Sequence, residues 1–198
     1  MGTGAPRAPG LVPGVRQDYE SALRWSETRA GVIRINEAIT DRTATVWLRE
    51  IALIKQRGLR NCRVLITSPG GGAYAALAIY DALVDLANSG CKITATVEGL
   101  AASAAAMIVL QAATVRNARA HARFLVHECR RWVFFSVERT SDIRDEAKEM
   151  ESLAKVIWDI LAKRCGKTTG EVEALVERKE VWMSATEAKE WGLIDAVL

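Results

Sequence analysis

The sequence predicts a single α/β domain that is built around a largely parallel sheet. Short apolar runs rich in valine and isoleucine alternate along the chain with longer segments whose apolar residues follow the helical period. With 198 residues, the chain has the length of one domain with a substantial core. We expect this domain to occupy residues 17–198, after a flexible tail at residues 1–16.

In the first half of the chain, the predicted strands and helices alternate. Thr40 is an N-cap residue in front of apolar positions with helical spacing, and Gly58 ends the same segment. The glycine-rich segment 68–72 lies between a strand and a helix and predicts a loop. The predicted elements are a short helix at 19–27, strands at 32–35 and 63–67, and helices from Thr40 to Gly58 and at 73–89.

The second half repeats this pattern and adds two capping boxes. Thr168 with Glu171, and Ser184 with Glu187, are spaced so that each pair can satisfy free N–H groups at a helix start. A single apolar stripe within 141–164 predicts a long amphipathic helix. The predicted elements are strands at 93–97 and 123–126, a turn at 98–102, helices at 103–113, at 141–164 and after each capping box, and a last strand near Ile194.

The composition excludes several classes of protein. The net charge is only +3 and no dense Lys/Arg stripe is present, so we expect no nucleic-acid partner. The four cysteines are too widely spaced for a zinc site or a redox pair, so no metal site is indicated. The most apolar stretch, residues 99–110, is shorter than the ~20 residues of a membrane span. We therefore expect a cytoplasmic protein that has no membrane partner.

Two strand–loop–helix turns carry groups that are suited to acyl transfer. In the first, consecutive glycines remove side-chain bulk where the backbone can approach a ligand. In the second, Ser103 places a hydroxyl at a helix start, where free N–H groups favour a developing negative charge. A serine beside a second N–H donor can attack a carbonyl while both N–H groups stabilise the oxyanion. Taken alone, each turn also has an ordinary explanation, as a tight turn or as a tolerated serine.

The position of one histidine favours the catalytic explanation of these two turns over the ordinary one. His127 ends the apolar run 124–126, so its imidazole should lie at the carboxyl end of a strand, where open α/β sheets bind their ligands. The other histidine, His121, lies in a polar turn and is better suited to an exposed role. His127 is therefore the candidate base for Ser103, and a half-buried structural histidine is the alternative.

Four segments of the chain, taken in order, resemble the motifs of the Clp peptidase family. The likeness covers residues 31–198, with a break at about 130–165. The matching segments are Ser68-Pro69-Gly70-Gly71 with Ala78-Ile79-Tyr80-Asp81, Gly99-Leu100-Ala101-Ala102-Ser103, Asn117-Ala118-Arg119 through His127, and Trp182-Met183-Ser184-Ala185 to Gly192-Leu193-Ile194-Asp195.

The resemblance implies a fold, a site and an assembly. The fold would be the ClpP/crotonase-like fold of repeated ββα units. Ser103 would be the nucleophile and His127 the general base and later acid, while Gly71 and Ala104 would offer the N–H groups of the oxyanion hole. The family relation also implies a homo-oligomer of stacked rings, which receives unfolded protein or peptide substrates from a Clp-family AAA+ ATPase and needs no metal or organic cofactor.

Three departures from the family pattern limit these expectations. Glu180 stands where the family usually has an orienting aspartate, and it is either the third member of a Ser-His-Glu triad or a surface charge. Bulky and cationic residues at 128–135 replace a glycine-rich strand that lines the family's cleft, which puts double-ring assembly and substrate range in question. The segment before residue 20 keeps little of the family's axial segment, which leaves ATPase docking in question.

The main expectation is a serine endopeptidase, and three alternatives stay open. One is a phage-type head-maturation peptidase, because a glutamate before Trp182 is also found in the phage and prophage branch of the family. Another is a catalytically silent ring subunit. The third is a crotonase-like acyl-CoA enzyme, which holds a thioester enolate with two backbone N–H groups and does not need both Ser103 and His127.

Overall fold

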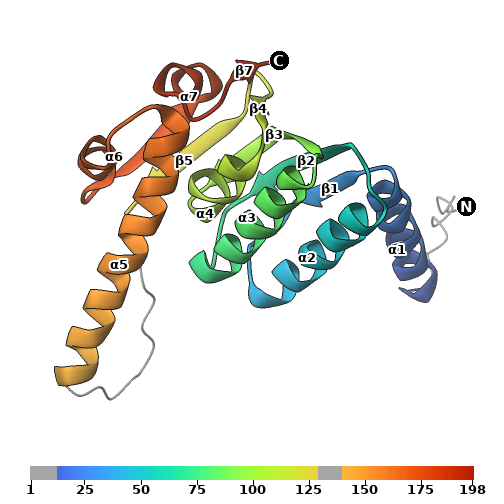
Figure 1. Cartoon of the computed structure of the whole chain (residues 1–198), viewed down its shortest axis with the longest axis horizontal. Coiled ribbons are helices and arrows are strands. Elements are labelled where there is room, and N and C mark those ends of the chain that lie inside the picture. Colours follow the sequence, from blue (N-terminus) through green and yellow to red (C-terminus); the bar gives the residue numbers. More distant parts are fainter. Residues whose placement is uncertain (1–12, 129–139) are drawn as a thin grey trace, which may run out of the picture.

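The computed structural model describes residues 13–128 and 140–198, with side chains from residue 19 onward in the first range and from 141 in the second. Seven strands, seven α-helices and one 3₁₀ turn form this part of the chain, and strands and helices alternate from α1 to α4 (Figure 1). In order, the elements are α1 (Pro13–Arg29), β1 (Val32–Ile35), α2 (Asp41–Gln56), β2 (Asn61–Ser68), α3 (Ala73–Asn88), β3 (Lys92–Ala102), α4 (Ala104–Met107), η1 (Val109–Ala112), β4 (Val115–Ala118), β5 (Arg123–His127), α5 (Thr140–Cys165), α6 (Thr169–Val176), β6 (Glu180–Ser184), α7 (Ala185–Trp191) and β7 (Ala196–Val197).

The sheet confirms the predicted α/β class with largely parallel strands. Its main path runs β1-β2-β3-β4-β7, and every pair along this path is parallel. β3 changes neighbours on one side: residues 94–97 pair with β4, and residues 100–102 pair with β5. β6 is antiparallel to β5 and extends the sheet beyond it. The region where β4 gives way to β5 therefore lies beside the carboxyl end of β3.

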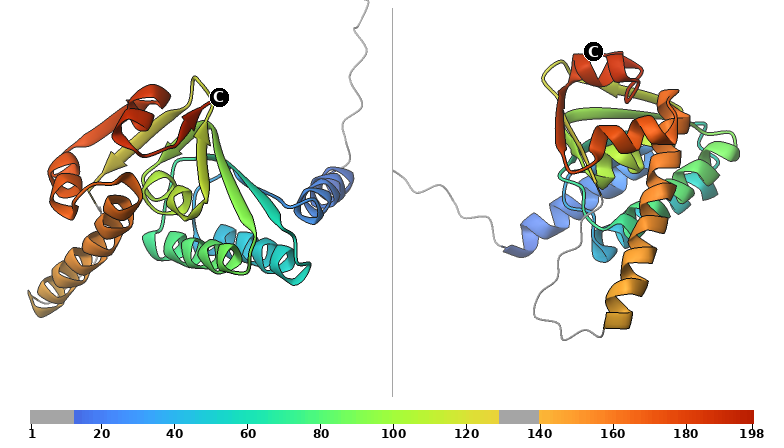
Figure 2. Two further views of the ribbon diagram at one scale, coloured as in Figure 1. Left: turned by 45° about the horizontal axis from the view of Figure 1, so that its top comes forward. Right: turned by 90° about the vertical axis from the view of Figure 1, so that its left-hand side faces the viewer.

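Helices α2 and α3 lie side by side against one face of the sheet (Figure 2). The buried face of α2 includes Trp47, which has no exposed surface and donates from its indole N–H to the carbonyl of Arg34 at 2.8 Å. This bond ties the helix to β1 and satisfies a polar group that burial would otherwise leave without a partner. Thr40 and Thr43 form the capping box that begins α2, as the sequence predicts for Thr40.

Helix α5 packs against α4 and α6 and projects beyond the body at its amino-terminal end (Figures 1 and 2). Ile157 and Leu161 anchor its second half in the core, whereas Ile143 in its first half is 53% exposed. Both capping boxes predicted from sequence begin helices, at Thr168 for α6 and at Ser184 for α7. Among the described residues, no helix is both long enough and apolar enough to cross a bilayer.

The structure corrects several sequence predictions in and around the site. The predicted turn at 98–102 continues as strand, because β5 supplies new partners for β3 there. The predicted helix at 103–113 breaks at Ile108 into α4 and η1. β4 and β6 were not predicted, because β4 contains Arg116 and Asn117 and β6 has only three consecutive apolar residues. The final strand begins at Ala196, after the predicted position near Ile194.

At the amino terminus, α1 begins at Pro13 and thus includes residues 13–16 of the expected tail. Residues 1–12 and 129–139 lie outside the described residues. The second of these ranges contains Cys129 and most of the segment 128–135, in which the sequence departs from the family pattern.

Candidate active site

Ser103 lies at the sharp junction between β3 and α4. Its backbone has φ 53° and ψ −128°, which is a strained conformation for a residue with a side chain and costs roughly 1–3 kcal/mol. Two sets of hydrogen bonds hold it there. The Ser103 N–H donates to the Leu125 carbonyl at 2.8 Å, and the Ser103 carbonyl accepts from the N–H of Ala106 and of Met107 at 3.0 and 2.8 Å. The hydroxyl-bearing residue is therefore fixed to α4 on one side and to β5 on the other.

The glycine loop packs directly against this junction. Gly70 has φ 84°, and a Cβ built on it would lie 2.4 Å from the Ala102 carbonyl oxygen and 2.8 Å from Ser103 Cβ. Gly71 has φ 147°, and a Cβ there would lie 2.1 Å from the Ile39 carbonyl oxygen. Both positions therefore require glycine, for steric reasons as well as for their backbone angles.

Hydrogen bonds to Ile39 set the direction of the loop. The Ile39 N–H donates to the Gly70 carbonyl, and the Gly72 N–H donates to the Ile39 carbonyl, both at 2.8 Å. In this parallel bridge, the groups on either side of Gly71 face Ile39, so the N–H of Gly71 itself points to the opposite side. The Ala104 N–H is the first of the short helix α4, whose four residues can supply only a small dipole. An anion at this site would therefore be stabilised by individual N–H groups and not by the dipole of a long helix.

His127 is the last residue of β5, one strand away from Ser103. Its side chain is half-buried, and its Nδ1 is hydrogen-bonded to the main-chain carbonyl of Glu128. Because a carbonyl oxygen can only accept, Nδ1 must carry the proton in this bond. In the neutral ring this leaves the lone pair on Nε2, which is the form that a general base for a serine needs.

Glu180 lies directly opposite His127 in the antiparallel register of β5 and β6. Side chains of directly opposed residues share one face of a sheet, with Cβ atoms about 4.5–5.5 Å apart. Leu125 and Trp182 form the next pair on that face, and Glu180 is exposed at its end. The Glu128 carboxylate accepts from the Arg178 N–H at 3.3 Å, which ties the turn before β6 to the end of β5. The strand register, which the sequence did not predict, therefore brings Glu180 beside the histidine.

One large cavity contains most of the predicted site. It has a volume of about 870 Å³ and is lined by Ser103, His127, Gly71 and Ala104 together. Glu180 is not among its lining residues and lies opposite His127 on the neighbouring strand β6. The remaining walls are mainly apolar and come from the loop before α2, the start of α3, α4, β5 and α5: Ala38, Ile39, Thr40, Pro69, Gly72, Ala73, Tyr74, Met107, Ile108, Leu125, Glu146, Glu149, Met150, Leu153 and Ile157.

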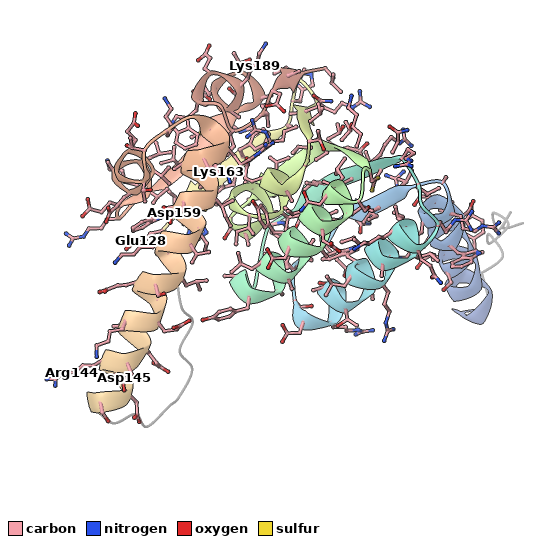
Figure 3. All side chains as sticks on the ribbon, viewed as in Figure 1. Glu128, Arg144, Asp145, Asp159, Lys163 and Lys189 are labelled. Carbon is pink, nitrogen blue, oxygen red and sulfur yellow. The ribbon has the colours of Figure 1, made fainter. Side chains whose placement is uncertain are left out.

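Glu128 lines a second, smaller cavity of about 120 Å³, which adjoins α5. Met150, Ala154 and Trp158 of α5 line it together with Glu128, which Figure 3 labels beside that helix. The residue that follows the histidine is thus close to the helix that forms one wall of the main cavity. Sequence reasoning gave Glu128 no role, because its carbonyl and carboxylate bonds depend on the tertiary structure.

Other reactive groups are poor candidates for chemistry. Burial raises the pKa of Cys62 to about 12 and that of Cys165 to about 11, so both thiols stay protonated near neutral pH. Within residues 13–128 and 140–198, no three His, Cys, Asp or Glu side chains are placed to hold a metal ion.

Comparison with known proteins gives a consistent result. The family model described as Clp protease matches residues 18–198. An ATP-dependent Clp protease proteolytic subunit of Bacteroides fragilis is 34% identical over 140 residues, which is 70% of this chain and 64% of the relative. Subunit 2 of Chlamydia trachomatis is 33% identical over 172 residues (84% and 80%), and subunit 1 of Salinibacter ruber is 29% identical over 206 residues (100% and 84%). The chain thus spans less than two thirds of the length of the Bacteroides relative.

Proposed function

The chain belongs to the Clp protease family, and we propose that it is a serine endopeptidase that hydrolyses unfolded proteins or peptides inside an oligomeric chamber. The observation that carries the proposal is that Ser103, His127, Gly71 and Ala104, which come from separate segments of the chain, line one cavity. Ser103 would be the nucleophile, His127 the base, and the N–H groups of Gly71 and Ala104 the oxyanion donors.

In the proposed mechanism, one proton moves twice. Ser103 Oγ attacks the peptide carbonyl as His127 Nε2 takes the hydroxyl proton, and the carbonyl oxygen becomes an oxyanion held by the two N–H groups. The C–N bond then breaks, the departing amine takes the proton from Nε2, and an acyl ester of Ser103 remains. Water attacks this ester by the same route, releasing the acid and restoring the serine.

Glu180 would orient His127 and stabilise its protonated form. The Nδ1 proton now faces the neutral Glu128 carbonyl, and a carboxylate on the same strand face is a stronger acceptor for an imidazolium. We therefore expect the replacement of the Glu128 carbonyl by the Glu180 carboxylate as acceptor to matter only when the imidazole is protonated. The proposed triad is therefore Ser103, His127 and Glu180, in which the glutamate tunes the base.

The proposed assembly is a homo-oligomeric ring, stacked with a second ring and served by a Clp-family AAA+ ATPase in the cytoplasm. The relatives of this chain are ATP-dependent Clp protease proteolytic subunits, which supports this proposal. Large apolar side chains on the projecting helices α1 and α5, such as Tyr19, Trp25 and Ile143, are exposed in the single chain and would be available for contacts between subunits. No metal or organic cofactor enters the proposed mechanism.

A fluorophosphonate probe tests the proposal directly. The assembled protein should become covalently labelled, and Ser103→Ala should abolish the labelling. Ser89→Ala, which changes a serine at the far end of α3, should label like the parent. An assembled, folded sample that neither reacts with the probe nor cleaves unfolded casein would contradict the proposal and favour a silent ring subunit.

A further inference from the structure

Tyr74 and Glu149 connect two walls of the proposed substrate cavity. Tyr74 is the second residue of α3, just after the glycine loop, and Glu149 lies in the projecting half of α5. Both line the cavity that contains Ser103, and the Tyr74 hydroxyl donates to the Glu149 carboxylate at 2.7 Å. Tyr74 is 60% exposed, so this bond lies at the mouth of the cavity. The bond to Glu149 raises the pKa of Tyr74.

The wall formed by α5 changes character along its length. Ile157, which is 3% exposed, lies at the buried end, and the half-buried Leu153 and Met150 follow toward the amino terminus of the helix. Glu149 and then Glu146 continue the same stripe. Residues 146 and 157 are separated by about 16 Å along a helix, which is the length of roughly five residues of extended peptide. A bound peptide could therefore meet an apolar surface and a carboxylate on the same wall.

We propose that Tyr74 and Glu149 form a specificity-determining pair, which selects peptides that carry a lysine or arginine close to the cleaved bond. The inference rests on the proposed peptidase function and adds a substrate class to it. The long aliphatic stem of such a side chain would lie on Met150 and Leu153, and its cation would reach the Glu149 carboxylate. Tyr74 holds one carboxylate oxygen over the cavity, so the acceptor is already positioned when the substrate binds.

Matched peptides test the selection. A fluorogenic peptide is varied at one position at a time, on both sides of the cleaved bond, with lysine, acetyl-lysine or norleucine. At one position we expect a kcat/KM about fivefold higher for lysine than for either neutral side chain, which is the scale of a partly exposed charge pair. Glu149→Gln should reduce this ratio to about 1, and added salt should lower it in the parent.

Asp145→Asn is the matched control. Asp145 lies on the same helix, labelled near its far end in Figure 3, and its side chain is 77% exposed. It pairs with Lys148 at 3.5 Å and is not among the residues that line the cavity. This variant removes the same charge from α5 and should leave the lysine preference unchanged. Tyr74→Phe, which keeps the ring but frees the carboxylate, should give an intermediate ratio.

Several outcomes would overturn the inference. These are a parent ratio near 1 at every position, a ratio that survives in Glu149→Gln, or an equal loss in Asp145→Asn. A higher ratio in Tyr74→Phe would contradict the positioning role of Tyr74. Binding of labelled lysine and norleucine peptides to the Ser103→Ala protein, followed by fluorescence anisotropy, measures the same preference without turnover. Failure of the peptidase proposal and failure of the specificity pair are therefore distinguishable.

Discussion

The two halves of the proposed site are built in different ways. On the nucleophile side, Ser103 is surrounded by small buried residues: Ala102, Ala104, Ala105 and Ala106 are all at most 5% exposed. Gly70 lies against the same junction with no room for a methyl group. On the base side, His127 lies at the end of β5, beyond the residues that pair with β3, and its partner strand β6 carries the exposed Glu180 and Trp182, which is 49% exposed.

The two halves of the site therefore depend on different kinds of interaction. The nucleophile is held by steric contacts in the core, so a change there should alter stability and chemistry together. The base is held by strand register and by acceptors on an exposed face, so a change there should alter chemistry with little effect on folding. The following predictions test this separation, in order of decreasing effect.

Gly70→Ala should give the largest effect. The new methyl group would lie 2.4 Å from the Ala102 carbonyl oxygen, on a backbone with φ 84°. We expect a loss of about 2–4 kcal/mol in the free energy of unfolding, measured by urea denaturation. Labelling of Ser103 by a fluorophosphonate should slow on the order of 100-fold, because the attacking oxygen is displaced.

Gly72→Ala is the control for this prediction. Gly72 has an ordinary φ of −61°, and the nearest atom to an added Cβ is 3.7 Å away. This variant should keep both the equilibrium constant for unfolding and the rate of labelling within about twofold of the parent. Equal behaviour of the two variants would refute the steric account of the nucleophile side.

Glu180→Gln should slow peptide cleavage with almost no loss of stability. We expect a decrease in kcat on the order of 100-fold, less than the roughly 10⁴-fold typical of a triad carboxylate, because the Glu128 carbonyl already holds the neutral tautomer. Glu180→Asp should retain more activity than Glu180→Gln. Glu177→Gln, a neighbouring exposed change, should have no effect on kcat, and an unaltered kcat in Glu180→Gln would make Glu180 a surface charge.

Acid should destabilise the carboxyl-terminal end of the sheet slightly. Burial raises the pKa of Asp195, but the hydrogen bonds and positive charge of Arg116 lower it more, and the net pKa lies below its ordinary value. The Arg116–Asp195 pair therefore makes its full contribution to the free energy of unfolding above pH ~4, the ordinary pKa of aspartate. This contribution is lost as the pH falls through the lower pKa that Asp195 has in the folded state.

Asp195→Asn tests this contribution. Because the Asp195 side chain is 40% exposed, we expect it to cost only about 1 kcal/mol at pH 7, although Arg116 is 94% buried. The variant should also flatten the acid side of the stability curve, followed by thermal denaturation from pH 6 to pH 3. A parent and a variant with parallel curves would show that the pair does not titrate in this way.

Sequence patterns predicted the elements that depend on local signals. Capping residues and apolar periodicity located α2, α6 and α7, and the glycine loop with Ser103 and His127 pointed to one sheet edge. β6 was missed because its apolar run, residues 181–183, is only three residues long and lies between the polar residues Glu180 and Ser184. The cross-cavity bond of Tyr74 with Glu149 joins residues 75 positions apart, and no local pattern can reveal such a pair.

The change of neighbour along β3 has an evolutionary consequence. The cavity lies where β3 stops pairing with β4 and begins to pair with β5. Its location is therefore determined by strand connectivity and not by the side chains around it. Substitutions along the α5 wall can therefore alter which sequences are accepted without relocating the point of attack. Related proteins could therefore evolve different peptide specificities while their catalytic residues keep the same positions.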